Sequence, residues 1–390
     1  MRHPVRTASL VLLAVGVVYG GLLLLEVLLW SAWSAPPGAD RRSLWQVVDE
    51  LRGQGDDALA YLSPFTDAEL GQGFQAPDGT TLPILTGPAF AVTVTCNEFG
   101  AWGGYTADRY GFNNPDGAWD TARRPLVVLG GDAAAGYCGM PGTDAGTGLR
   151  GTYRSVVNLG QGGAPAIGQL AILKEFALAL RPCLVVWLVA EDEPLVLPDD
   201  VPPVLLGYLQ PRFRLDVMRN AEDKDTQYRL VHEMRYAAGE PTAATDNLTL
   251  DASLFRLPRA RLYLSGPGRA LVGPRVVPGP GSAEAEFFAE VLQEGVDALR
   301  SLSAETLVVY LPAFASAVTG VPTAEHAVAW NAAVDAGADW LDLTPQFATD
   351  PEVRDLFAAS RPNRYSEAGY QRVAGAIADY LGTATSCALR

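Results

Sequence analysis

The sequence predicts a three-layer α/β domain built on a parallel sheet, preceded by one membrane-spanning helix. Five short apolar runs rich in Val and Leu have the length of buried strands: Leu126 to Leu129, Val156 to Leu159, Leu184 to Val189, Leu307 to Leu311 and Trp340 to Leu343. Segments with helical periodicity separate or follow several of these runs: Ile167 to Leu180, Ala283 to Leu302, Ala324 to Ala336 and Glu367 to Leu381. Continuous apolar strands that alternate with helices are typical of a doubly wound parallel sheet covered on both faces.

The N-terminal segment is the longest apolar stretch of the chain. Leu10 to Trp30 is interrupted only by Glu26, and at about 1.5 Å per residue it is long enough to cross a hydrocarbon layer of about 30 Å. We therefore expect residues 1–33 to be an uncleaved single-pass anchor. A cleaved signal peptide is the alternative, because Ala32 to Ser34 offers small residues where a signal peptidase requires them.

Charges and small residues around this segment suggest its orientation and its contacts. Arg2 and Arg6 precede it, which favours a cytoplasmic N-terminus and a periplasmic or otherwise extracytoplasmic body. Gly16 and Gly20 form a small-xxx-small pair, which permits close approach of another membrane helix. We expect the partners to be the lipid bilayer and membrane protein subunits.

Composition shifts suggest two parts after the anchor, the second of them with an insertion. Residues 34–87 mix Pro, Gly and Asp with short helical patches, which we interpret as a stalk, and residues 88–390 form the α/β body. Residues 199–262 are longer than a crossover requires and are expected to be an insertion. Gly-Pro groups between Ser265 and Ser282 disfavour helix and central strand, so this stretch is expected to be a surface loop.

The overall charge excludes one class of partner. The chain has a formal net charge of -15 and a pI near 4.7, whereas proteins that bind nucleic acids need clustered Lys and Arg to displace counterions. The four cysteines and three histidines show no metal-ligand spacing. We expect no nucleic acid, metal or cofactor.

A glycine-rich turn follows the run that ends at Leu129. In open α/β sheets ligands bind beyond the carboxyl ends of the strands, so Gly130 to Gly136 is a natural place for a site. This turn resembles the Gly-Asp-Ser motif of the SGNH/GDSL hydrolases, with Asp132 in register and Ala133 in place of the nucleophilic serine. The resemblance implies a flavodoxin-like, three-layer fold of the SGNH type.

Other segments follow the same family order, from about Leu70 to Leu381. The lead-in to the turn is similar to that of a membrane-anchored bacterial branch, with Cys96-Asn97-Glu98 and Asp108 to Asp116. Asn158 to Pro165 resembles the second motif and contains Gly160 and Gly163. The strand through Trp187, followed by Glu191, resembles the one that delivers the third motif.

The resemblance implies that the remaining catalytic positions are also replaced. Glu193 falls where the family has the asparagine that donates into the oxyanion hole, and an ionised carboxylate has no hydrogen to donate. Arg364 falls on the family's histidine, and a guanidinium cannot act as a general base. With Ala133 unable to attack a carbonyl, we expect no ester hydrolysis. We also expect an ion pair between Glu193 and Arg364 across the former pocket, which contains Asp132, Gly160 and Gly163.

The cysteines are placed by the same resemblance. The anchored branch carries cysteine in the lead-in and after the turn, so Cys96 and Cys138 are expected to form a disulfide that joins the lead-in loop to the rim of the site. Cys183 and Cys387 are expected to be free.

The leading hypothesis is a non-catalytic accessory subunit of a membrane complex. One alternative is an active esterase or acyltransferase on envelope glycans or lipids that uses a displaced serine, with the candidates Ser155, Ser360 and Ser366. Another is a sensor in which Arg364 and backbone amides hold an acyl or carboxylate group. The histidines are expected at the surface or in helix packing, and none lies near a candidate serine in sequence: His3, His232 and His326.

Overall fold

The computed structural model describes residues 16–25, 40–191, 197–239, 279–358 and 364–382 of the chain. The chain divides into two units, one of residues 1–41 and 246–277 and one of residues 42–245 and 278–390. In the first unit residues 16–25 are helical, and their apolar side chains Val17, Val18 and Leu24 are exposed. Over the described ranges, no helix has both the length and the hydropathy to cross a membrane. The expected anchor extends beyond residues 16–25 at both ends and stays a prediction.

The second unit contains a five-stranded parallel sheet in the order β10-β9-β8-β6-β7. Its strands are β6 (Leu126–Gly130), β7 (Val156–Asn158), β8 (Leu184–Ala190), β9 (Glu305–Leu311) and β10 (Asp339–Asp342). Each coincides with one of the predicted apolar runs to within two residues. The α/β class and the parallel sheet are therefore confirmed.

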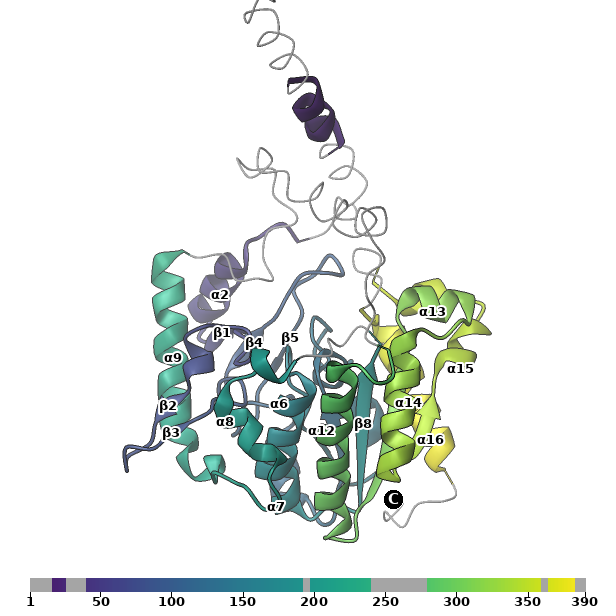
Figure 1. Cartoon of the computed structure of the whole chain (residues 1–390). Helices are drawn as coiled ribbons and strands as arrows, with labels where there is room; N and C mark the ends of the chain where they lie inside the picture. The colour runs from purple at the N-terminus through teal and green to yellow at the C-terminus, as the bar shows by residue number, and fades with distance from the viewer. Residues whose placement is uncertain (1–15, 26–39, 192–196, 240–278, 359–363, 383–390) are drawn as a thin grey trace, which may run out of the picture. The chain divides into compact units, whose positions relative to one another are not determined.

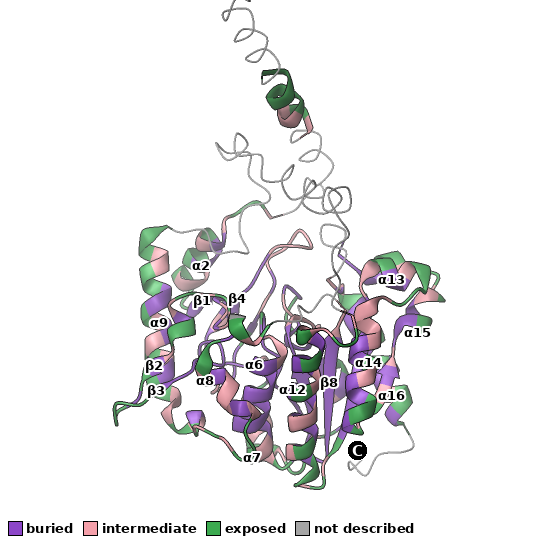
Figure 2. Ribbon diagram, in the orientation of Figure 1, coloured by how far each residue is buried: buried purple, intermediate pink, exposed green. Residues whose placement is uncertain are grey.

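Side chains of the sheet alternate between two cores. Val127 and Leu129 belong to one buried cluster and Leu126 and Val128 to the other, as the pleat of a strand requires. The helices that complete the first cluster are α6 (Ala166–Ile172), α12 (Ala283–Arg300) and α14 (Ala324–Ala336). Those that complete the second are α5 (Ala145–Arg150), α13 (Phe314–Thr319), α15 (Thr344–Ala348) and α16 (Glu367–Leu381). Figure 1 shows β8 between α12 and α14, with α6 next to α12, and Figure 2 shows buried positions alternating with exposed ones along these helices. Helices thus cover both faces of the sheet.

One crossover contains an irregular helix. After α6 the chain continues through a π-helical turn, Leu173–Ala177, into α7 (Leu178–Leu180). The buried Glu175 of this turn accepts hydrogen bonds from the hydroxyl of Tyr208 and the backbone amides of Leu215 and Val217. The turn therefore anchors part of the predicted insertion.

The expected stalk, residues 34–87, is folded from residue 42 onward. Its elements are α2 (Leu44–Gly53), β1 (Ala58–Ala60), the 3-10 turn Leu70–Gln72, β2 (Phe74–Gln75) and β3 (Thr81–Leu82). β1 pairs in parallel with β4 (Val92–Val94), which pairs with β5 (Gly104–Thr106), and β2 pairs with β3. Leu70, Phe74 and Leu85 are buried in the main core. The stalk is corrected accordingly, because short apolar stretches between turn residues form part of the body.

The insertion packs against this same segment. It contains α8 (Pro203–Leu206) and α9 (Ala221–Ala238). The hydroxyl of Tyr228 bonds both the amide and the carbonyl of Leu62, and Nε2 of the fully buried His232 accepts the amide of Ala60. Residues 240–262 of the insertion, and most of the expected loop that follows them, lie outside the described residues.

Two titratable groups of α9 are buried in this contact. Nζ of Lys224 donates to the carbonyl of Gly87 at 2.6 Å, and burial lowers the pKa of Lys224 to about 8. Burial also lowers the pKa of His232, and the neighbouring carboxylate of Glu233 only partly offsets this. Burial therefore shifts both groups toward their neutral forms relative to the unfolded chain.

Candidate functional site

The turn after β6 is held in place by packing from behind. Gly130 has a φ of 152°, and a Cβ there would lie 2.7 Å from the carbonyl oxygen of Leu188. A Cβ on Gly160 would lie 2.3 Å from the carbonyl carbon of Ala134. Glycine is therefore required at both positions for the turn to approach its neighbours.

A buried polar network fixes the same turn. Nδ2 of Asn158 donates to the carbonyl of Ala134 at 2.7 Å, and Oδ1 of Asn114 accepts the amide of Asn158 at 2.7 Å. Asn114 in turn donates to Asp108 at 2.8 Å, and burial raises the pKa of Asp108 despite hydrogen bonds from Trp119 and Asn114. The lead-in motif thus positions the turn.

The turn itself leads into α4 (Asp132–Ala135). Ala133, at the position that the resemblance gives to the nucleophile, is half-buried and lines a cavity. Its methyl group has no lone pair and no proton to transfer. Packing and hydrogen bonds therefore fix the turn, but the side chain it presents to the cavity cannot attack a carbonyl.

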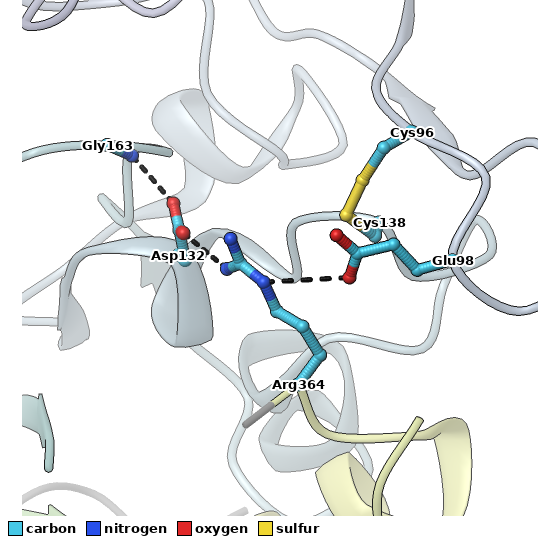
Figure 3. Close-up of a disulfide and its surroundings, with 6 residues drawn as sticks. All are labelled: Cys96, Glu98, Asp132, Cys138, Gly163 and Arg364. Atoms are coloured by element: carbon cyan, nitrogen blue, oxygen red, sulfur yellow. Dashed lines mark hydrogen bonds and ion pairs between the residues drawn. A yellow bond between two sulfur atoms is a disulfide. The ribbon is translucent and has the colours of Figure 1, made fainter. Parts of the chain in front are cut away.

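Arg364 reaches this turn from the segment before α16. Its guanidinium forms an ion pair with Asp132 and a second one, at 3.6 Å between Nε and the carboxylate, with Glu98. It also lies over the ring of Tyr137, 5.3 Å from the centroid. Figure 3 shows Arg364 between the two carboxylates, which come from the lead-in loop and from α4. One cation thus joins three segments that are far apart in sequence.

The charge of Arg364 is fixed by these neighbours. Burial lowers its pKa, but the charges of Asp132 and Glu98 outweigh burial, so the pKa is raised above the usual range. A group that keeps its proton at every working pH cannot accept one from a nucleophile. Arg364 can hold charge and position the loops, and it cannot serve as a general base.

The other carboxylate oxygen of Asp132 also accepts a hydrogen bond. Oδ1 of Asp132 accepts the backbone amide of Gly163 at 2.6 Å (Figure 3). Gly163 has a φ of +73°, which favours glycine. A carboxylate of the protein itself therefore occupies this donor.

The predicted ion pair between Glu193 and Arg364 stays a prediction. Arg364 pairs with Asp132 and Glu98, whereas Glu193 lies outside the described residues. Glu98 stands in the Cys96-Asn97-Glu98 motif, but nothing in the sequence indicated its contact with the distant Arg364. Glu191, which follows β8, instead accepts the amide of Ala313 and the hydroxyl of Ser316, so it anchors the start of α13.

A disulfide supports the lead-in loop beside this site. Cys96 and Cys138 are bonded, with their Cα atoms 4.9 Å apart, so the predicted pair is confirmed (Figure 3). The carboxylate of Glu98 lies close to the two sulfur atoms. Because these sulfurs are bonded to each other, they are not thiolate ligands for a metal.

The expectation that Cys183 is free is wrong. Cys183 is disulfide-bonded, although its position just before a buried strand is equally typical of a small apolar side chain. Cys387 lies outside the described residues.

The site opens into a cavity of about 350 Å³. Asp132, Ala133, Gly163 and Arg364 all line it. Gly160 packs behind the turn and does not line the cavity. The structure thus brings together most of the residues that the sequence assigned to a former pocket, around a volume large enough for a small molecule.

The candidates for a displaced nucleophile have other roles. Ser366 caps α16, where its hydroxyl accepts the amide of Gly369 and donates to the carbonyl of Asp355. Ser155 precedes β7 and so lies at the amino ends of the parallel strands, opposite the edge that carries the site. Ser360 lies outside the described residues.

The histidines lie away from the cavity lining. His232 packs in the contact between α9 and β1, and His326 bonds Asp342 at 2.9 Å beside the ring of Tyr310. A surface or helix-packing role was expected of both. His3 lies outside the described residues.

Comparison with known proteins gives matches among solved structures. No protein-family model matches the sequence, and no curated protein matches it. A protein described as lipolytic and of the G-D-S-L family, from Desulfitobacterium hafniense DCB-2, is 16% identical with a TM-score of 0.36, over 66% of this chain and 100% of that chain. A lipase/acylhydrolase from Enterococcus faecalis is 12% identical with a TM-score of 0.37, over 68% and 98%. An acetyl xylan esterase is 12% identical with a TM-score of 0.35, over 66% and 99%. The fold itself defines the class, which is an α/β protein built on a five-stranded parallel sheet.

Proposed function

We propose that this chain is a non-catalytic, membrane-anchored accessory protein whose extracytoplasmic, SGNH-like body serves in protein contacts. The observation that carries the proposal is the guanidinium of Arg364, ion-paired with Asp132 and Glu98 beside Ala133. Serine-type hydrolysis needs a nucleophile and a base within hydrogen-bond reach of each other. Among the described residues that line the cavity there is no serine, cysteine or histidine.

The chemistry left at the site supports the loss of hydrolysis. Arg364 holds its proton, Asp132 accepts the amide of Gly163, and Ala133 has no hydroxyl. Loss of one catalytic group typically lowers the rate by several orders of magnitude, and the remaining groups act as a unit with it. A fold retained without this chemistry is better suited to binding than to turnover.

Two features support the proposed location. The apolar segment from Leu10 to Trp30 has the length of a membrane span. Cys96 and Cys138 are joined and Cys183 is also disulfide-bonded, and stable disulfides are typical of oxidising compartments outside the cytoplasm. The partners that follow from this arrangement are membrane protein subunits, contacted by the anchor and by the body.

The esterase alternative has less support. Ser366 is a helix cap and Ser155 lies at the opposite edge of the sheet. The carboxylate sensor is also disfavoured, because the amide of Gly163 and the guanidinium of Arg364 already bind acids of the protein.

Two measurements on the full-length chain test the proposal. Solubilised in mild detergent, it should co-purify with membrane protein partners, and replacing residues 1–33 by an unrelated membrane helix should weaken this association. It should turn over short-chain p-nitrophenyl esters no faster than a heat-denatured sample. Purification only as a free monomer would contradict the accessory role, and turnover that a serine-reactive phosphonate abolishes would contradict the absence of catalysis.

A further inference from the structure

The walls of the cavity are mostly apolar, and much of this surface comes from outside the central sheet. One part belongs to residues 42–87 and another to the insertion around α8. The larger apolar side chains of these two parts are Phe65, Ile84, Val201, Val204 and Leu205. The two segments that the sequence suggested were a stalk and an insertion therefore build an apolar compartment beside the turn.

This apolar compartment is fixed by contacts with the rest of the body. The hydroxyl of Ser63 donates to the carbonyl of Gly162 at 3.0 Å and accepts the amide of Phe65 at 3.3 Å. The ring of Phe65 packs against α6, where a Cβ on Gly168 would lie 2.6 Å from it. Leu205, on α8, is buried in the main core. Walls that are already ordered lose little conformational entropy when a ligand binds.

The charged residues of the lining neutralise each other. Among the residues that line the cavity, the charged ones are Asp132 and Arg364, which form an ion pair. The other carboxylate oxygen of Asp132 accepts the amide of Gly163 at 2.6 Å, and the hydroxyl of Tyr365 donates to the carbonyl of Pro312 at 2.5 Å. A charged ligand would lose its hydration in this lining without gaining an unpaired counter-charge. The lining therefore favours an uncharged ligand.

We propose that the cavity binds an uncharged ligand that has a single alkyl chain and a small polar end such as a hydroxyl group. The chain lies between the walls formed by residues 42–87 and by the insertion, and the polar end lies toward Asp132 and Arg364. A volume of about 350 Å³ is near the lower end of the range for ligand pockets, which suits one chain. This inference goes beyond the accessory function, and its test is separate because the probes contain no ester bond and no protein partner is needed.

The test measures binding to the full-length chain in nanodiscs of a zwitterionic lipid by isothermal titration calorimetry at pH 7.5, with empty nanodiscs subtracted. The probes are 1-octanol, octanoate and octyltrimethylammonium, which share one chain length, and the shorter 1-hexanol. Val204→Phe narrows the cavity at a half-buried wall position. Val321→Phe, at a side chain that is 63% exposed between α13 and α14, is the matched control. Asp132→Asn leaves Arg364 as the charged residue of the lining.

1-Octanol should bind at least about tenfold more tightly than octanoate or octyltrimethylammonium. It should also bind about tenfold more tightly than 1-hexanol, because it buries two more methylene groups. Equal or tighter binding of either charged probe would overturn the uncharged ligand, and equal binding of the two alcohols would overturn the alkyl chain.

The variants assign the binding to this cavity. Val204→Phe should weaken 1-octanol about tenfold, and Val321→Phe should leave its binding unchanged. Asp132→Asn should strengthen octanoate about tenfold relative to 1-octanol, since Arg364 then has no acid beside it in the lining. Unchanged binding of 1-octanol in Val204→Phe would overturn the assignment to this cavity. An unchanged ratio in Asp132→Asn would contradict the role of the ion pair in excluding charged ligands.

Discussion

Replacing Arg364 by Gln tests whether its guanidinium holds the site together. Arg364→Gln leaves Asp132 and Glu98 beside each other without their shared cation. Removing one partner of a fully buried ion pair costs about 3–5 kcal/mol, whereas exposed pairs contribute about 0–1 kcal/mol. The side chains here are 20% (Arg364), 30% (Asp132) and 10% (Glu98) exposed, so they lie between these limits and nearer the buried one. We expect a loss of about 2 kcal/mol in the free energy of unfolding.

The assay is urea unfolding of the full-length chain in nanodiscs, followed by tryptophan fluorescence with the disulfides intact. Arg219→Gln is the matched control, because Arg219 pairs with Asp216 at the surface, where the two side chains are 82% and 54% exposed. It should cost no more than about 0.5 kcal/mol. The double variant Asp132→Asn, Arg364→Gln should lose less than the sum of the single variants, since it also removes one of the two acids that Arg364 bridges. If Arg364→Gln is as stable as the native chain, the ion pairs do not hold the site and the reasoning is refuted.

Three further predictions concern two buried groups of α9, Lys224 and His232, and the disulfide between Cys96 and Cys138. Because the pKa of Lys224 is lowered to about 8 from 10.5, the folded chain binds fewer protons than the unfolded chain between these values. The free energy of unfolding should therefore rise by about 1–2 kcal/mol from pH 8 to 9.5. Urea titrations should find a smaller rise in Lys224→Met, and an equal rise in that variant would contradict the assignment of this pH dependence to Lys224. Because the pKa of His232 is lowered from 6.5, its contribution is complete above pH 6.5 and is lost as the pH falls below it. Thermal unfolding between pH 7 and 5 should show this loss in the native chain and a smaller one in His232→Gln, whose amide oxygen can still accept the amide of Ala60; equal losses would argue against a neutral His232. Finally, the Cys96–Cys138 bond closes a separation of 42 residues. By chain entropy, the double variant Cys96→Ser, Cys138→Ser should lose about 4 kcal/mol of the free energy of unfolding, measured by urea titration. A loss of less than about 1 kcal/mol would show that the bond adds little to stability.

The sheet and its main helices could be predicted from the sequence because their patterns are local. Each strand of a covered parallel sheet is a continuous apolar run, and the run Leu184 to Val189 corresponds to β8. The helix predicted over Ala324 to Ala336 has these bounds in the structure. The segment 42–87 gave no such signal, because its strands are two or three residues long and obtain their stability from contacts with α9.

The candidate site could be predicted in part for a related reason. The resemblance placed Ala133, Gly163 and Arg364 near one another, and the structure brings all three to one cavity. The partners of Arg364 could not be deduced, since an ion pair between distant segments depends on how loops return to the sheet edge. Glu98 reaches Arg364 because the disulfide at Cys96 holds its loop against the turn.

The most direct test of the central claim is the intact mass of the full-length chain after reaction with a fluorophosphonate, which labels activated serines. The account predicts no adduct on the native chain, because Ala133 has no hydroxyl and Arg364 cannot act as a base. A stoichiometric adduct on any serine, prevented by prior heat denaturation, would show an assembled nucleophile and would contradict the account.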